Sequence, residues 1–511
     1  MARPYFNSSD LINAIKRKIA MPLSQVTFSE ADILAFCNEE MAISQVPSVM
    51  VFHQEYFAYK VVTPLVSGIS RYPIPDRSIG MRLRDLAWSD TAGNYFEMTR
   101  INADDKAYFQ RNIGSNQAIH KFYLEGNDVV LTPSLVGVTT GNLNFFIFLR
   151  PNQLVDVTRA CTIQSFQKDI TVSHTSMAVG DSITITSGNN EVSPSALLLT
   201  CTDFGITSSS AATSSVITTA TPHGHAIGST FQVTISEHTG STPAINSSYA
   251  ATATGASTFT IPVTVSVGGT GGKVAFDNQF SMGTTMLVCA TNLANAINLA
   301  LGDTPATTSS TEIVSYTYSD ISTTFSLSVA NTTSMVLDND NIYINFDQLP
   351  TTYIDPTTGI SETLFAINEQ VDFLQTKAGH KTHVYDVALS GISGNQGKVS
   401  RNSLLYYSST GTGGVQNMLP IVVGDYMCLA NECIIPQIPS DLHNGLAERA
   451  ASRILAALGD AAGAAASDKK IAEIEQRQGT MLDNRVDGSC PKVTQRHSQL
   501  AFQKQSNRRR I

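Results

Sequence analysis

Charged side chains are scarce in this sequence: they make up 15% of its 511 residues, against roughly 25% in ordinary globular proteins. No apolar run approaches the ~18 residues that span a membrane, and the first residues, Met1-Ala-Arg-Pro4, lack the apolar core of a signal peptide. Disorder is not expected either, because it combines low hydrophobicity with high net charge, and the formal net charge is only −9. We therefore expect a soluble, folded chain of two to four domains with a hydroxyl-rich β surface.

A disulfide framework is also missing. The seven cysteines are odd in number and widely scattered, which indicates folding in a reducing compartment. Cys428 and Cys433 are five residues apart beside β-like segments. We interpret them as buried structural thiols, with a redox or zinc pair as the alternative.

The charge that is present is unevenly distributed. Residues 165–360 contain thirteen Asp or Glu but only two basic residues, Lys168 and Lys273, whereas the flanking segments are nearly neutral. From Arg485 onward there are seven Lys or Arg against one acidic residue, Asp487. This asymmetry predicts an acidic insertion in a near-neutral host domain that ends in a basic tail.

Both ends of the chain show helical periodicity. The first helix is predicted from Leu11, Ile12, Ile15 and Ile19. Ser29, with Asp32 in the reciprocal capping position, predicts the start of a second helix, and Pro47 predicts its end. Near the C-terminus, a stripe that steps by four predicts the first helix of an αα-hairpin, whose residues Leu446, Ile454 and Leu458 should face other helices.

The segments between these helices are predicted to form strands. Turns at Ala92-Gly93-Asn94 and Gly126-Asn127-Asp128 predict a small antiparallel β module. From about 165 to 375, short β-branched runs alternate with turn residues, which is typical of sandwich or barrel-like modules. A flexible linker is the alternative, but linkers do not carry large apolar side chains, and this region contains Phe231, Phe259, Phe276, Phe280, Phe325 and Phe346.

Together these patterns predict an α+β protein. It combines a helical bundle (the N-terminal helix pair and the C-terminal αα-hairpin) with the small β module and a large inserted all-β region. We divide the chain into the N-terminal helices and β module of the core (1–160), the acidic insertion (165–375), strands that return to the core (376–435), the helical hairpin (436–487) and a basic extended tail (488–511).

Motifs that carry chemistry are weak. His223-Gly-His225 and His380-Lys-Thr-His383 have spacings that metals sometimes use, but no matching ligands lie nearby, and we interpret them as surface or turn histidines. The glycine-rich segments 268–272 and 411–414 do not open a helix after a strand, so they are interpreted as loops rather than phosphate sites. Asp338 and Asp340 fit a solvated turn better than a Ca²⁺ site. We predict no enzyme activity, cofactor or metal.

The ends of the chain resemble the head–tail adaptor (connector) proteins of short-tailed bacteriophages. The resemblance rests on the order of two helices, Ile74-Pro75-Asp76-Arg77 through Asp85, the Asp90–Asn94 turn, Phe122 through Asp128 and Phe148-Leu-Arg150-Pro151. The closing segments Ile438-Pro-Ser-Asp441 and Ala456-Ala-Leu-Gly459-Asp460 are similar to the C-terminal helix of those proteins. In the middle, Ile217 through Gly224, Ile245 through Tyr249 and Ser257 through Ile261 look like a β module of phage tail and fibre proteins, which ordinary adaptors lack.

The resemblance implies a virion structural protein in the neck of the particle, assembled in the host cytoplasm. Such a protein forms a homo-oligomeric ring of about twelve copies on the portal protein, joins it to a downstream tail or nozzle protein, and surrounds the passage of genomic DNA without contacting a membrane. The portal-binding residues we predict are all in the basic tail: Lys492, Arg496, Lys504, Arg508, Arg509 and Arg510.

Two other classes of protein remain open. Another tail, fibre or decoration protein would also use β modules, although fibre proteins usually carry repeats or heptads. A carbohydrate-active or lytic enzyme would need paired carboxylates in a cleft, and the single tryptophan, Trp88, lies outside the β region.

Overall fold

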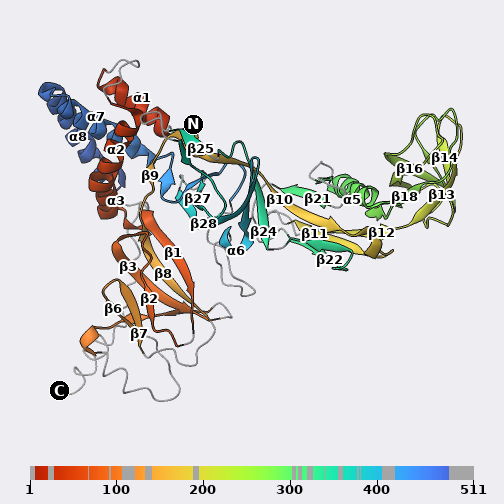
Figure 1. Ribbon diagram of the computed structural model, residues 1–511, viewed down its shortest axis with the longest axis horizontal. Helices are drawn as coiled ribbons and strands as arrows, with labels where there is room; N and C mark the ends of the chain where they lie inside the picture. Colours follow the sequence, from red (N-terminus) through yellow and green to blue (C-terminus); the bar gives the residue numbers. More distant parts are fainter. Residues whose placement is uncertain are drawn as a thin grey trace, which may run out of the picture. The chain divides into compact units, whose positions relative to one another are not determined.

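The chain forms two compact units. The computed structural model describes residues 6–20, 28–66, 68–90, 94–105, 121–132, 141–187, 195–301, 306–308, 313–318, 326–338, 340–350, 352–354, 361–376, 379, 381–404 and 421–482. Unit 1 consists of Met1–Leu154 and Ile438–Ile511, and unit 2 consists of Val155–Gln437 (Figure 1). The protein is mixed α+β with more strand than helix, and it includes a closed β-barrel, as predicted.

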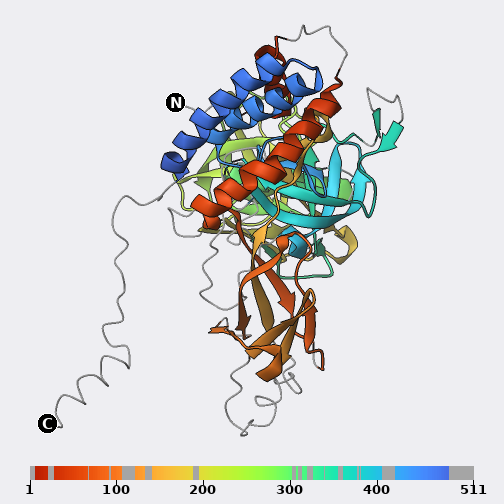
Figure 2. The same cartoon turned by 90° about the vertical axis from the view of Figure 1, so that its left-hand side faces the viewer.

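Unit 1 brings helices from both ends of the chain together. They are α1 (Ser8–Lys18), α2 (Glu30–Glu40), α3 (Val46–Phe52), α7 (His443–Ala457) and α8 (Ala461–Leu482). Helix α7 packs against α1, α2 and α8 (Figure 2). Ten of its 15 residues are buried. The predicted capping box is confirmed, because the Ser29 side chain accepts from the Asp32 amide while the Asp32 carboxylate accepts from the Ser29 amide.

Pro47 does not end the second helix. A π-helical turn, η1 (Met41–Gln45), follows α2 directly and runs into α3, where proline occupies one of the first positions. Proline is tolerated there because the first amides of a helix have no partner inside it. The wider turn is closed by the Val46 amide, which donates to the Met41 carbonyl five residues back, and the chain continues as α3.

Leu458 does not face other helices as predicted. Leu446 and Ile454 are fully buried, but Leu458 is 45% exposed. Helix α7 ends at Ala457 and Leu458 is its C-terminal cap, followed by Gly459 with a positive φ of 81°. The apolar pattern in the sequence therefore extends about one turn beyond the part of the helix that is packed.

The rest of unit 1 is two small sheets. One has the order β1 (Ala58–Pro64), β8 (Asn142–Leu149), β3 (Ser78–Ser89) and β4 (Tyr95–Glu97). The other has the order β2 (Arg71–Pro73), β7 (Asp128–Thr132), β6 (Lys121–Glu125) and β5 (Thr99–Arg100), and β9 (Gln153–Leu154) follows β8 along the chain. The predicted turn at Gly126 is confirmed, since β6 pairs with β7 across it. Strands β3 and β4 also pair as expected, but Ala92 and Gly93 of the other predicted turn lie outside the described residues.

Unit 2 is built on a nine-stranded sheet. Its order is β20 (Ala306–Thr308), β21 (Ile313–Tyr318), β10 (Cys161–Val172), β24 (Asn341–Phe346), β29 (Gln396–Ser400), β28 (Lys381–Ser393), β27 (Gln370–Gln375) and β30 (Tyr426–Leu429), with β23 (Met335–Leu337) also paired to β10. Short strands β25 (Thr352–Ile354) and β26 (Ser361–Thr363) pair with each other, and α6 (Arg401–Leu404) and β31 (Glu432–Cys433) complete the unit.

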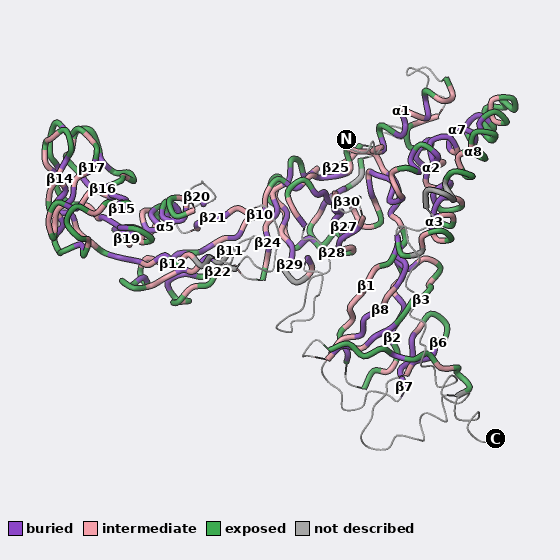
Figure 3. The backbone as a smooth tube through the Cα atoms, turned by 180° about the vertical axis from the view of Figure 1, so that it is seen from behind, coloured by how far each residue is buried: buried purple, intermediate pink, exposed green. Residues whose placement is uncertain are grey.

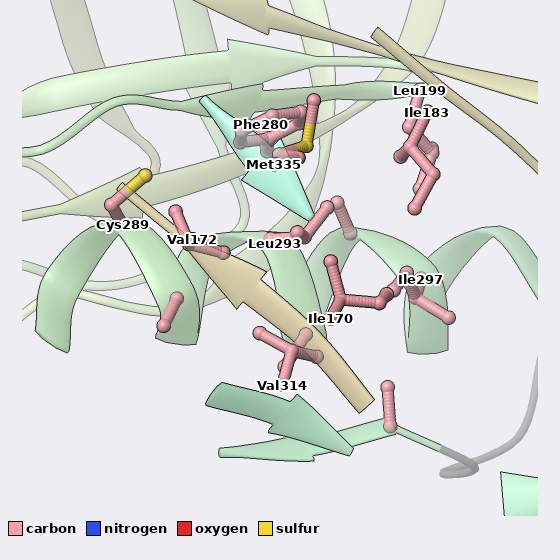
Figure 4. Close-up of a cluster of buried hydrophobic side chains, with 14 of the residues drawn as sticks. Ile170, Val172, Ile183, Leu199, Phe280, Cys289, Leu293, Ile297, Val314 and Met335 are labelled. Carbon is pink, nitrogen blue, oxygen red and sulfur yellow. The ribbon is translucent and has the colours of Figure 1, made fainter. Parts of the chain in front are cut away.

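A smaller sheet in unit 2 packs against a helix. Strands β19 (Gln279–Ser281), β12 (Ser195–Thr202), β11 (Ser182–Ser187) and β22 (Ser326–Val329) are neighbours in that order. Helix α5 (Met286–Leu301) contributes Cys289, Leu293 and Ile297 to their shared core (Figure 4). Phe280 lies in this core at 1% exposure.

The closed barrel lies within unit 2 between β12 and β19 in the sequence. Its strands are β13 (Phe204–Ser209), β14 (Ser215–Thr219), β17 (Thr258–Ile261), β16 (Ser248–Gly255), β15 (Thr230–Ser236) and β18 (Lys273–Phe276), in that order around the barrel. Phe231, Phe259 and Phe276 are buried in its core, as expected for a folded module rather than a linker. Between residues 204 and 272, Glu237 is the single charged residue.

Unit 2 is larger than the insertion drawn from the sequence at 165–375. Strands β28, β29 and β30, which we assigned to the core as returning strands (376–435), hydrogen-bond to β27, β24 and β10 inside unit 2 instead. We therefore expect a fragment of residues 155–437 to fold by itself, whereas a fragment of residues 165–375 loses these strands and the first part of β10 and should not. Circular dichroism and limited proteolysis measure both; equal resistance of the two fragments would contradict the pairing.

Among the described residues, no helix is both long enough and apolar enough to span a membrane.

Candidate functional site

The predicted portal-binding residues Lys492, Arg496, Lys504, Arg508, Arg509 and Arg510 lie outside the described residues, as does His380. The element that leads to the basic tail is α8, which is described as far as Leu482. We therefore take the helices around α8 as the candidate site and build it from their contacts.

A buried glutamate links three of these helices. Glu448 of α7 is 4% exposed. It accepts hydrogen bonds from Lys18 Nζ of α1 at 2.6 Å and, from α8, from Ser467 Oγ at 3.2 Å and Lys470 Nζ at 3.4 Å. Burial by itself raises the pKa of Glu448, but Lys18 and Lys470 lower it, and the net shift is downward. The carboxylate therefore remains charged and holds α1 and α8 against α7.

Glu40, the last residue of α2, is a second buried glutamate, and it links α2 to α7. It pairs with Arg449 at 3.3 Å and with Arg453 at 2.7 Å, both from α7. Arg449 also pairs with Glu475 of α8. Breaking such buried pairs is costly because an uncompensated charge is left behind. These ion pairs connect α2, α7 and α8.

Sequence reasoning missed both glutamates. The available signal was local: Glu448 interrupts a run of small and apolar residues, Gly445-Leu-Ala-Glu448-Arg-Ala-Ala451. A charge at such a position requires a partner. Its partner Lys18 is 430 residues away in the sequence, so no spacing rule could name it.

The outer side of α8 is solvent-exposed. Gly463, Ala464, Ser467, Ile471 and Ile474 are buried or half-buried, whereas the other residues through Arg477 are exposed (Figure 3). One side of α8 thus packs on unit 1, and the opposite side is available for contacts outside it.

The histidines of the barrel are not surface residues. His223 is buried; its Nε2–H donates to the Thr258 carbonyl at 3.3 Å, and its Nδ1 accepts from the His225 amide at 3.2 Å. The His225 ring stacks on Phe231 with centroids 3.9 Å apart. His383 is also buried, and burial lowers its pKa to about 4. The expectation of a surface position is wrong for His223 and His383, because both rings are buried. His223 does lie in the loop between β14 and β15, as the turn interpretation expects, whereas His383 lies within β28.

Acidification is expected to destabilise the barrel. Burial lowers the pKa of His225, the neighbouring His223 lowers it further, and Asp277 opposes both. Because the pKa is lower in the folded than in the unfolded state, the stabilisation is complete above the unfolded value of about 6.5 and declines as pH falls below it. His225→Phe keeps the stack and removes the titration, so its melting temperature should fall less between about pH 7.5 and pH 5. Equal decreases in both proteins would contradict this.

A serine–histidine pair lies inside the same barrel. Ser209 Oγ is 2.9 Å from His238 Nε2, and His238 Nδ1 is 2.6 Å from the Gly271 carbonyl oxygen. This is hydrogen-bond reach for a nucleophile and a base, but Ser209 Oγ also accepts from the Gly269 amide at 2.8 Å, and both side chains are buried. A Cβ at Gly269 would lie 2.6 Å from His238 Nε2 and overlap the Thr239 carbonyl. The pair therefore anchors the glycine-rich loop 268–272 against the barrel.

The remaining candidates are structural. Asp338 accepts from the Asn341 amide at 3.2 Å and from the Tyr343 hydroxyl at 3.1 Å, as the turn interpretation predicts. Cys428 and Cys433 are buried, and burial raises the pKa of Cys428. The described residues contain no group of three or more His, Cys, Asp or Glu placed to hold a metal ion.

Comparison with known proteins gives no family. No protein-family model matches the sequence, and no curated protein is significantly similar to it.

Proposed function

We propose that this protein is a ring-forming head-to-tail adaptor of a short-tailed bacteriophage, which binds the portal vertex, connects it to the tail and forms part of the DNA passage. One observation carries the proposal: helices from both ends of the chain come together in unit 1, with α7 central and α8 exposed on its outer side. This is the order of elements in which the sequence resembles adaptors, and in this proposal unit 1 is the host helical bundle and β module.

The requirements of a ring support the same function. Cyclic assembly needs two different surfaces on each subunit, and it needs a subunit that keeps its shape. The Glu40 and Glu448 ion pairs join α1, α2, α7 and α8, which favours a stiff helical layer. The basic tail that follows α8 is suited to attachment, because about twelve copies acting together convert weak contacts into a stable joint.

The alternative is another tail, fibre or decoration protein, and the barrel favours it. A closed β-barrel with one charged residue between 204 and 272 suits a module displayed for surface contacts. In the adaptor proposal this module is an accessory of the ring, carried in unit 2.

Deleting residues 504–511 is expected to reduce attachment of the purified protein to DNA-filled, portal-bearing heads at least about tenfold, because multivalent contacts are lost in every copy. Attachment of the intact protein should weaken as salt rises, since exposed charges are screened beyond roughly 8–10 Å near physiological ionic strength. Co-sedimentation with heads measures both.

The matched control replaces Gln503, Gln505, Ser506 and Asn507 with alanine, which keeps every charge, and should attach normally. Undiminished attachment of the deletion variant at low and high salt would leave the tail as a solvated terminus.

A further inference from the structure

Unit 1 exposes an apolar stripe on the continuous helix formed by α2, η1 and α3. Ile43 is 65% exposed and Val51 is 74% exposed, with the exposed Pro47 between them at intervals of four residues. Phe52 is 45% exposed beside Val51. We call Ile43, Pro47, Val51 and Phe52 the apolar stripe. Exposed apolar residues that are contiguous, rather than scattered singly, mark interaction surfaces.

The local backbone explains why these residues face outward together. In a regular α-helix, positions four apart drift by about 40° around the axis. The π-helical turn Met41–Gln45 widens the helix at Ile43, just before Pro47 in α3, which reduces this drift between the two positions. Meanwhile Met41, Gln45, Val46 and Val49 remain buried on the inner side. The stripe is therefore a continuous outer surface, separate from the core.

The outer side of α8 differs from the apolar stripe, because it carries mainly small side chains together with Lys469 and Gln476. Ala462, Ala465, Lys469, Ala472 and Gln476 are all exposed and recur at intervals of three and four residues, which places them on one face. The three alanines on this face leave room for the larger side chains of the stripe. The charges also complement each other. Glu39, one turn before Ile43, and Lys469 are both exposed, and neither forms an ion pair with any described residue.

We propose that the apolar stripe of one copy binds the outer face of α8 of a second copy, with Glu39 of the first beside Lys469 of the second. The two surfaces differ, so the contact is heterologous and repeats from copy to copy instead of stopping at a pair. The inference rests on the proposed function, because it supplies the side-to-side contact that an adaptor ring needs.

Cysteine cross-linking tests the contact. In protein carrying Cys490→Ser, the six remaining native cysteines are buried, so new exposed cysteines react selectively. Ile43→Cys and Ala465→Cys are prepared separately and oxidised at high concentration and on portal-bearing heads. The mixture should give cross-linked dimers, and each variant alone should not. A protein with both substitutions should give a ladder of higher multimers.

Charge reversal supplies the matched controls. Glu39→Lys and Lys469→Glu should each reduce the cross-linking yield several-fold, and combining Glu39→Lys in one partner with Lys469→Glu in the other should restore it. Both residues are exposed, so folding, measured by circular dichroism, should be unchanged. No cross-links in the mixture under either condition, or dimers of Ile43→Cys alone, would overturn the inference.

Portal binding separates this inference from the proposed function. If intact protein binds portal-bearing heads but the mixture gives no cross-links, the contact is wrong and the adaptor proposal stands. If cross-linked multimers form but neither intact protein nor multimers bind heads, the contact is correct and the adaptor proposal fails.

Discussion

Replacing Ile454 with aspartate is expected to destabilise unit 1 by about 3–5 kcal/mol, because it places an unpaired carboxylate in a core position. Ile454 is fully buried on α7, the helix that packs against α1, α2 and α8. The two cations nearest in the chain, Arg449 and Arg453, already pair with Glu40. Hydrogen exchange of unit 1 peptides during thermal unfolding measures the loss.

The matched control is Leu458→Asp, one helical turn further on. Leu458 caps α7 and is 45% exposed, so its carboxylate remains hydrated and the change should cost less than about 1 kcal/mol. Similar melting of the two variants would mean that the packing of α7 has been misassigned.

Replacing Phe280 with alanine is expected to destabilise unit 2 by about 3–5 kcal/mol, the usual cost of removing a buried phenylalanine ring. Phe280 lies in the core shared by the β19-β12-β11-β22 sheet and α5. Because this core belongs to unit 2 alone, the unfolding of unit 1 should be unchanged. Calorimetry, with hydrogen exchange to assign each transition, distinguishes the two units.

Leu198→Ala is the control for this variant. Leu198 lies on β12 of the same sheet but is 53% exposed, so its truncation should cost little. Loss of stability in unit 1 upon Phe280→Ala would contradict the division of the chain into two units.

Local features of this fold could be read from the sequence, because their causes are local. The capping box of Ser29 and Asp32 depends on residues three positions apart, and the β6–β7 hairpin depends on the turn at Gly126. The error at Pro47 has a local origin too: proline ends one helix and also suits the first turn of the next. Only the tertiary fold decides between these outcomes.

Long-range contacts could not be predicted from local sequence patterns. The extent of unit 2 depends on the pairing of β10 with β30, whose partners Cys161 and Met427 are far apart in the sequence. The link between Lys18 and Glu448 depends on bringing the two chain ends together. Of the candidate site, the sequence indicated the helices and the basic tail, while the buried glutamates and the exposed stripe required the three-dimensional structure.

The most direct test of the adaptor function is electron microscopy of the purified protein mixed with portal-bearing heads, with two-dimensional class averages and a mass measurement of the same sample. A head-to-tail adaptor should appear as added density that forms a closed ring at the portal vertex, with about twelve copies per head. Heads that show no added density at the vertex, while the protein binds elsewhere on the particle or not at all, would contradict the adaptor function.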